Sequence, residues 1–196
     1  GSFVSFPSKL KVTAKSGDKS GECTNSENGC SSGFVAAGEV FELTVSALQD
    51  DGSVAENYQE KTITVSNKVK YPSNGSLAKL LNERLPEPNK WSNGSVTFDQ
   101  SVSEVGAFEL IAEAPVAKDE NGDDIGTSLY LGSKAFKIAD GKSTIGRFYP
   151  DYFKVTGTEW TYPDNQNDSV YMGQNFASVK FEVTAYNADG YATQNY

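Results

Sequence analysis

The sequence predicts an all-β protein, a β-sandwich followed by the truncated start of a second sandwich. Apolar and polar residues alternate with period two in residues 41–47 and again in residues 179–185, which is the pattern of strands with one face on a core. Turn-forming dipeptides such as Asp51-Gly52 and Asn93-Gly94 separate the short apolar runs. Short strands divided in this way are typical of β-sandwiches. An internal repeat supplies the third observation and sets the boundary between the two parts.

The strands are expected where alternating or apolar runs lie between turn signals. In residues 41–47, for example, Phe41, Leu43 and Val45 alternate with Glu42 and Thr44. In chain order, we predict strands at residues 10–13, 41–47, 62–65, 96–98, 107–112, 129–131, 135–138, 153–156 and 179–185.

One short helix is expected at residues 76–85. Ser76 is of a type that caps helix N-termini, and Pro86 would end the helix. Four leucines would share one face of this helix: Leu77, Leu80, Leu81 and Leu85.

The internal repeat divides the chain into two modules of unequal length. Residues 6–13 read FPSKLKVT and residues 149–156 read YPDYFKVT, an offset of 143 (149 − 6). Farther along, Asn57-Tyr58 matches Asn195-Tyr196 at an offset of 138 (195 − 57), and loop length accounts for the difference. A period of this size is that of a domain. We therefore expect a complete sandwich at 3–145 and a partial second sandwich at 146–196.

The two modules are expected to be joined stiffly. Residues 145–150 contain no Gly/Ser-rich or Pro-rich spacer. An incomplete second sandwich would expose unpaired strand edges and apolar faces. We therefore expect residues 146–196 to pack against the first module or to pair with another copy as a strand-exchanged dimer.

Composition excludes several classes of function. The formal net charge is −9, which disfavours nucleic acid as a partner. No apolar stretch approaches the roughly 20 residues needed to span a membrane. The sequence contains no His, so Ser-His and Cys-His nucleophile pairs cannot form. We expect no enzyme activity and no catalytic residues. A glycosidase is the one sensible enzymatic class left, because its chemistry needs only a pair of carboxylates. With 26 Asp and Glu residues in the chain, such a pair is too common to identify a glycosidase.

The two cysteines, Cys23 and Cys30, flank a polar, turn-forming segment. A disulfide between them would close a loop of about eight residues and contribute about 2.5 kcal/mol in the chain-entropy model. Free thiols or half of a metal site are the alternatives. A disulfide implies an oxidising compartment and therefore a secreted or surface-exposed protein.

A second polar loop, residues 118–124, carries oxygen ligands at close spacing. Asp119, Asn121 and Asp123 suit a hard cation such as calcium. The loop lacks the Glu that closes an EF-hand, because the twelfth position from Asp119 is Tyr130. The alternative is a solvated hairpin loop with no cofactor.

Aromatic, Asp and Asn side chains gather in residues 160–171. Rings stack on the faces of sugars and carboxylates accept hydrogen bonds from hydroxyl groups, so this segment is the candidate carbohydrate site. The alternative is a loop whose aromatic residues pack on the end of the sandwich. The candidate ligand-binding residues are Trp160, Tyr162, Asp164 and Asn165.

Several motifs in the last quarter of the chain carry a family resemblance. Residues 146–153 read GRFYPDYF, residues 171–174 read YMGQ, and residues 184–196 contain AYNADG and TQNY. This pattern resembles MshQ-type proteins, which are encoded with the mannose-sensitive haemagglutinin (type IV) pilus of Gram-negative bacteria. Tyr152 stands where His is common in that family. Residues 1–145 resemble a bacterial immunoglobulin-like module.

The resemblance implies an extracellular protein of the Gram-negative cell surface or pilus, exported through the periplasm. Our leading hypothesis is a structural or adhesive module that acts in attachment or as a stalk; the alternative is a carbohydrate-binding module. The expected partners are neighbouring domains of the parent protein, pilus or cell-surface components and a glycan.

Overall fold

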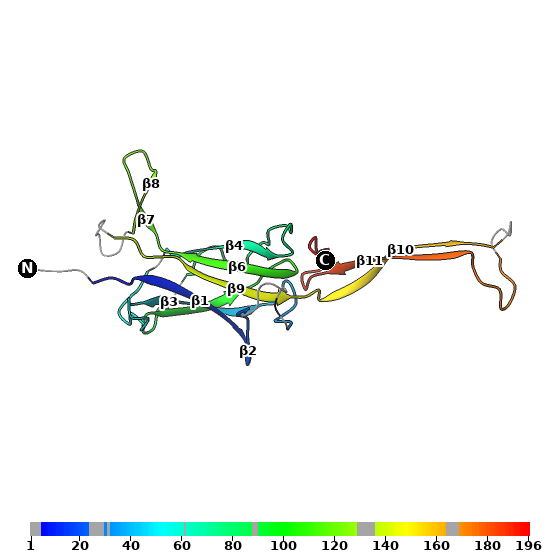
Figure 1. Ribbon diagram of the computed structural model, residues 1–196, viewed down its shortest axis with the longest axis horizontal. Helices are drawn as coiled ribbons and strands as arrows, with labels where there is room; N and C mark the ends of the chain where they lie inside the picture. Colours follow the sequence, from blue (N-terminus) through cyan, green and yellow to red (C-terminus); the bar gives the residue numbers. More distant parts are fainter. Residues whose placement is uncertain are drawn as a thin grey trace, which may run out of the picture.

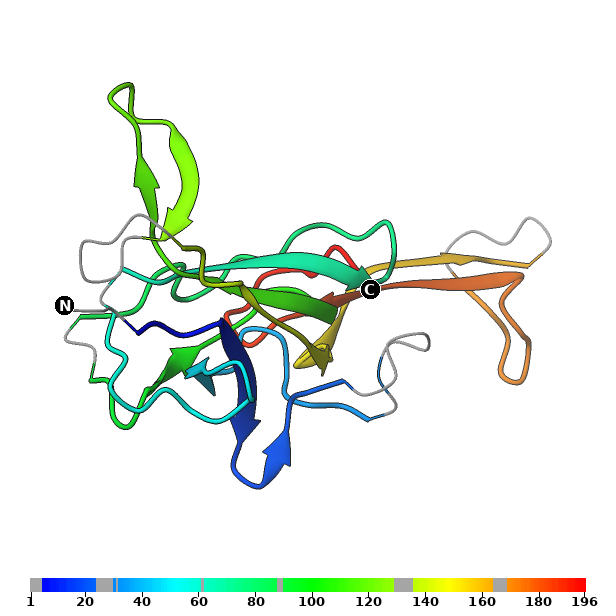
Figure 2. The same cartoon turned by 60° about the vertical axis from the view of Figure 1, so that its left-hand side comes forward.

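Two antiparallel sheets face each other in the first part of the chain, and a long two-stranded ribbon continues from them (Figure 1). The computed structural model describes residues 5–23, 30, 32–60, 62–87, 90–128, 136–163 and 169–196. Figures 1 and 2 show the ribbon projecting from one end of the sandwich, away from the N-terminal segment. None of the described residues forms a helix that could cross a bilayer.

The sandwich has the strand order of immunoglobulin-like domains. One sheet has the order β2-β1-β3-β5 and the other the order β4-β6-β9. By chain order, β1, β3 and β5 of the first sheet correspond to strands A, B and E of an immunoglobulin domain. Strands β4, β6 and β9 of the second sheet correspond to C, F and G. The first sheet consists of β1 (Lys9–Ser16), β2 (Lys19–Ser20), β3 (Phe41–Leu48) and β5 (Ser95–Gln100). The second consists of β4 (Thr64–Tyr71), β6 (Gly106–Glu113) and β9 (Gly141–Phe148).

Two hairpins extend from this body. The β7–β8 hairpin comprises β7 (Val116–Lys118) and β8 (Asp124–Ser128). The second hairpin is the ribbon, formed by β10 (Tyr152–Thr161) and β11 (Ser178–Tyr186). Only three residues separate β9 from β10, so the second sheet of the sandwich leads almost directly into the ribbon.

The core lies between the two sheets. The alternating positions of β3 are buried and contribute one layer, as the period-two pattern predicts. Phe108 and Leu110 of β6 and Ile145 of β9 meet them from the other sheet. Phe34 and Phe148 join Phe41 in a cluster of rings with centroids 5.3 to 5.9 Å apart, which fills the end of the core nearest the ribbon.

Most of the predicted strands are present. The predictions at 10–13, 41–47, 96–98, 107–112, 153–156 and 179–185 are confirmed, and that at 62–65 overlaps β4. Residues 129–131 lie outside the described residues, as does residue 135. Residues 136–138 are irregular, so the predicted strand there is wrong; the chain meets β1 just afterwards, where Ala139 accepts a hydrogen bond from the Leu10 N–H.

Strand β9, at the edge of the second sheet, escapes the sequence patterns because its alternation is weak. Gly141 and Gly146 replace apolar side chains at two of its buried positions. A Cβ at Gly141 would lie 3.0 Å from the carbonyl carbon of Leu10, so close approach to β1 favours glycine there. The predicted module boundary at 145/146 lies within this strand.

The helix predicted at residues 76–85 is wrong. The segment is irregular, and its backbone groups pair with residues at the ends of β4 and β5 instead of with one another. Leu81 donates to the Ser101 carbonyl (3.2 Å) and Leu85 donates to the Ile63 carbonyl (3.2 Å). Ala78 and Leu85 are buried, whereas Leu77 and Leu81 are exposed. Tertiary pairing of the backbone therefore overrides the local leucine pattern.

Candidate interaction surface

The ribbon formed by β10 and β11 has two faces of opposite character. Phe153 opposes Ala185 and Val155 opposes Val183; a bulge at Thr156 then makes Thr158 oppose Phe181 and Trp160 oppose Val179. Because directly opposed residues lie on the same face of a sheet and alternate positions share that face, the bulge keeps the apolar residues of both strands together. We call this the apolar ribbon face; it consists of Phe153, Val155, Thr158, Trp160, Val179, Phe181, Val183 and Ala185.

The opposite face carries matched polar pairs. The Thr156 and Thr184 hydroxyl oxygens lie 3.0 Å apart, and the Lys180 ammonium donates to the Glu159 carboxylate at 3.2 Å. The Ser178 hydroxyl donates to that of Thr161 at 3.1 Å. These pairs suit a face that stays in water.

The ribbon reproduces the pairing of β1 with β3 in the first module. There Leu10 opposes Ala47 and Val12 opposes Val45; with the offsets of 143 and 138, these pairs become Phe153 with Ala185 and Val155 with Val183. The sequence repeat therefore corresponds to a structural repeat of the same strand register.

The turns that follow β3 and β11 are also equivalent, bond for bond. The backbone N–H of Gln49 donates to the Ser53 carbonyl at 2.8 Å, and the backbone N–H of its counterpart Asn187 donates to the Tyr191 carbonyl at 2.9 Å. Gly52 and Gly190 occupy the same turn position with φ of 87° and 81°, a conformation that glycine adopts without strain.

Equivalent positions differ sharply in exposure. Leu43 and Val45 are both 0% exposed in the core of the sandwich, whereas their counterparts Phe181 and Val183 are 63% and 58% exposed. Leu10 is buried and its counterpart Phe153 is half exposed. The apolar ribbon face is therefore the counterpart of a sandwich interior, without the opposing sheet that covers it in the first module.

Comparison with protein-family models assigns nearly the whole chain. Residues 6–105 match the second domain of DUF6701 and residues 104–196 match its third domain. The chain belongs to the DUF6701 family. Comparison with curated proteins and with solved structures gives no match. The two DUF6701 segments meet between β5 and β6, and β4 of the first segment pairs with β6 of the second. The sandwich is thus built from both.

The ribbon of the DUF6701 chain is anchored to the sandwich by buried polar side chains. The Glu104 carboxylate accepts hydrogen bonds from the backbone N–H groups of Gln194 (2.9 Å) and Asn195 (3.3 Å). The side chain of Asn187, which is 3% exposed, donates to the Ser103 carbonyl at 3.0 Å. These contacts bear out the expectation that the second module packs against the first, for the residues that follow β11.

Asn195 completes this anchor from the end of the chain. Its amide donates to the Ser76 carbonyl (3.0 Å), and its amide oxygen accepts from the Ser76 N–H (2.6 Å). The same amide donates to the Val105 carbonyl at 3.4 Å. We call the contacts of Glu104, Asn187 and Asn195 the junction clamp. The repeated Asn195-Tyr196 signal is visible in the sequence, but its partners Ser76 and Glu104 are not.

The candidate carbohydrate site is described only in part. Trp160 lies on the apolar ribbon face and is 50% exposed. Tyr162 packs on Phe176, with ring centroids 5.6 Å apart. Asp164 and Asn165 lie outside the described residues. Tyr171 and Phe176, in the segment between β10 and β11, are exposed as well. Carbohydrate binding stays a prediction.

The candidate calcium loop forms the turn of the β7–β8 hairpin. One carboxylate oxygen of Asp119 accepts hydrogen bonds from the backbone N–H groups of Asn121 (2.8 Å) and Asp123 (2.9 Å). The Lys118 ammonium donates to the Gly122 carbonyl in the same turn (3.1 Å). Within the part of the chain that the structure describes, no cluster of three or more His, Cys, Asp or Glu residues forms a metal site. Calcium binding stays a prediction.

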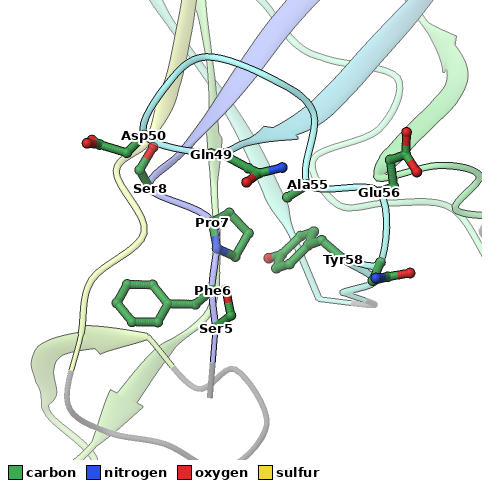
Figure 3. A pocket seen from close by; sticks show the side chains of 10 residues that line it. Ser5, Phe6, Pro7, Ser8, Gln49, Asp50, Ala55, Glu56 and Tyr58 are labelled. Carbon is green, nitrogen blue, oxygen red and sulfur yellow. The ribbon is translucent and has the colours of Figure 1, made fainter. Parts of the chain in front are cut away.

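A pocket at the opposite end of the sandwich is lined by residues 5–8 and by the turn after β3 (Figure 3). Gln49, Asp50, Glu56 and Asn57 line it, and these are the counterparts of Asn187, Ala188, Gln194 and Asn195 at the ribbon junction. In the nearby turn, the Ser53 hydroxyl and backbone N–H donate to Asp51 and hold the pKa of its carboxyl below its ordinary value. The lining of the pocket is thus the first-module counterpart of the second-module side of the junction clamp. It carries the carboxylates of Asp50 and Glu56 where the second module has Ala188 and Gln194.

Cys23 and Cys30 form the predicted disulfide. Cys30 is buried, and the Cys23 N–H donates to the Thr144 carbonyl of β9 at 2.8 Å. The disulfide therefore holds Cys30 to Cys23, and the backbone hydrogen bond of Cys23 ties this segment to the second sheet. A structural disulfide is typical of proteins exported to an oxidising compartment.

Removing the disulfide is expected to destabilise the DUF6701 chain without changing its fold. The Cys23→Ser, Cys30→Ser double variant should lose about 2.5 kcal/mol of unfolding free energy, because the unfolded chain regains loop entropy. Urea denaturation with and without a reducing agent measures this loss. The reductant should lower the stability of the wild type and leave the variant unchanged; an equal response of both would contradict the prediction.

Proposed function

We propose that this DUF6701 chain is a structural module of a bacterial surface or pilus-associated protein and acts as a stalk or attachment segment. In this proposal it is exported through the periplasm and performs no catalysis. The resemblance to MshQ-type proteins supports the pilus locus and the Gram-negative cell surface, and the disulfide supports export.

The observation that carries the proposal is the short, hydrogen-bonded connection between the sandwich and the ribbon. A stalk transmits force only when its modules keep a defined orientation, and a three-residue link gives little freedom of its own. The junction clamp adds further hydrogen bonds on the other side of the link, four of them partly buried. The Ala188 N–H also donates to the Ala37 carbonyl at 2.8 Å, so the segment before β3 holds the ribbon as well as the segments before and after β5.

The pocket at the opposite end gives independent support. Its turn repeats the geometry of the clamp turn, so the first module carries the same kind of docking end that the second module uses against the first. Repeated ends of this kind are expected of modules that stack in line. Neighbouring domains of the parent protein are therefore the partners that we propose for this surface.

Weakening the junction clamp is expected to loosen the ribbon while leaving the sandwich stable. Asn195→Ala removes three hydrogen bonds, two to Ser76 and one to Val105. It should raise amide exchange in residues 187–195 about 100-fold, since each lost bond is worth about 1 kcal/mol. Small-angle scattering should change from the profile of a rigid, elongated particle to that of a flexible one.

Gln194→Ala is the matched control, because the backbone N–H of Gln194 binds Glu104 and survives the substitution. This variant should scatter and exchange like the wild type. A wild-type profile that is already flexible would contradict the stalk proposal, as would an Asn195→Ala variant that stays as rigid as the control.

A further inference from the structure

The apolar ribbon face is built as an interior surface. Its six large apolar residues are 47% to 63% exposed, while the polar face behind them is internally paired. The counterparts Leu10, Val12, Phe41, Leu43 and Val45 are all buried under β6 and β9. A monomeric protein rarely exposes so large a contiguous apolar patch without a partner for it.

We propose that a second copy of this chain covers the apolar ribbon face, so that two ribbons stack face to face in a two-fold symmetric, four-stranded sandwich. The sheet that covers the equivalent strands of the first module is already in use, because β4, β6 and β9 pack on β1 and β3. Among the surfaces of the described residues, the same apolar ribbon face on a second copy matches the uncovered face in size and chemistry. The inference is independent of the stalk function.

Charge favours this pairing. The chain as a whole carries −9, but the two ribbon strands hold two lysines and two glutamates, Lys154, Lys180, Glu159 and Glu182, and are neutral. All four lie on the polar face by strand alternation. Two ribbons therefore meet without bringing charge into the interface, which is the usual obstacle to association of acidic chains.

Area and shape also suit a dimer. With six large apolar side chains each about half exposed, one face offers roughly 600 Å² and a pair would bury roughly 1,200 Å², the lower end of specific interfaces. The ribbon projects clear of the sandwich (Figures 1 and 2), so the bodies of the two copies do not obstruct the contact. An isologous contact of this kind closes on itself and stops at two copies.

Sedimentation equilibrium of the whole chain over a wide concentration range tests the proposal. The mass should rise from 21.1 kDa to twice that value. Over the same range, Trp160 fluorescence should shift to shorter wavelength as the ring leaves water, while Trp91, which packs against the core of the sandwich, contributes a constant background.

Val183→Lys should abolish dimerisation, raising the dissociation constant about 100-fold or more, because each dimer would bury two unpaired ammonium groups. Thr184→Lys makes the same charge change on the polar face and should dimerise like the wild type. Phe181→Lys provides a second disruption, and circular dichroism checks that all three variants fold.

Three results would overturn the proposal. The wild type could stay monomeric at every concentration, with Trp160 remaining in water. Val183→Lys and Thr184→Lys could dimerise equally well. The mass could also grow beyond two copies, which would indicate open-ended pairing through the free edge of β11 instead of face-to-face stacking.

Discussion

Leu43→Ala is expected to lower the free energy of unfolding by about 3 kcal/mol, whereas Phe181→Ala at the equivalent repeat position should lower it by less than about 1 kcal/mol. Leu43 is fully buried in the sandwich, and its truncation leaves a cavity. Phe181 is 63% exposed on the apolar ribbon face, so its truncation removes little packing. Because the two residues hold equivalent positions in the repeat, the difference between the two losses of stability reports the difference in burial.

Urea denaturation at a low protein concentration measures both values, because self-association through the ribbon would otherwise stabilise the folded state of one variant and not the other. A large cost for Phe181→Ala under these conditions would mean that its ring is covered within a single chain. A small cost for Leu43→Ala would mean that the core relaxes around the cavity.

Gly106→Ala is the second substitution with a large expected effect, about 3 kcal/mol or more. Gly106 begins β6 with φ of 124°, and a Cβ there would overlap the carbonyl oxygen of Tyr71 in β4. The substitution therefore adds backbone strain and forces apart two neighbouring strands in the sheet that leads to the ribbon.

Gly122→Ala in the β7–β8 turn is the matched control. Gly122 also has a positive φ, 88°, but a Cβ there would meet no atom within 4 Å. It should cost about 1 kcal/mol from strain alone. Chemical denaturation of the two variants separates strain from steric overlap, and equal losses would show that overlap with Tyr71 contributes nothing.

The sequence predicts much of the candidate surface through its repeat. The offsets of 143 and 138 align Val155 with Val12 and Val183 with Val45, and the structure pairs both sets in the same register. The bulge at Thr156 is not predicted, although the apolar positions of the strand shift from odd numbers (Phe153, Val155) to an even one (Trp160) across it. Without that bulge, Trp160 would lie on the polar face of the ribbon.

The disulfide and the all-β architecture also follow from local sequence, because cysteine spacing, turn dipeptides and period-two alternation are properties of neighbouring residues. The partners of the junction clamp do not. Asn195 meets Ser76 across 119 residues, and Glu104 receives N–H groups 90 and 91 residues away. Contacts of this separation depend on how the sheets pack.

By itself the sequence determines that this protein is built from strands, that they repeat, and that one face of each repeated strand is apolar. Tertiary structure alone decides which of those faces is buried. Leu43 and Phe181 belong to the same pattern, yet β6 and β9 cover the first, and no sheet of the described chain covers the second. The same long-range pairing explains residues 76–85, whose leucines follow a helical pattern while their backbone groups bond to neighbouring strands. Alternation records what a strand can bury, and only the arrangement of sheets supplies the surface against which it is buried.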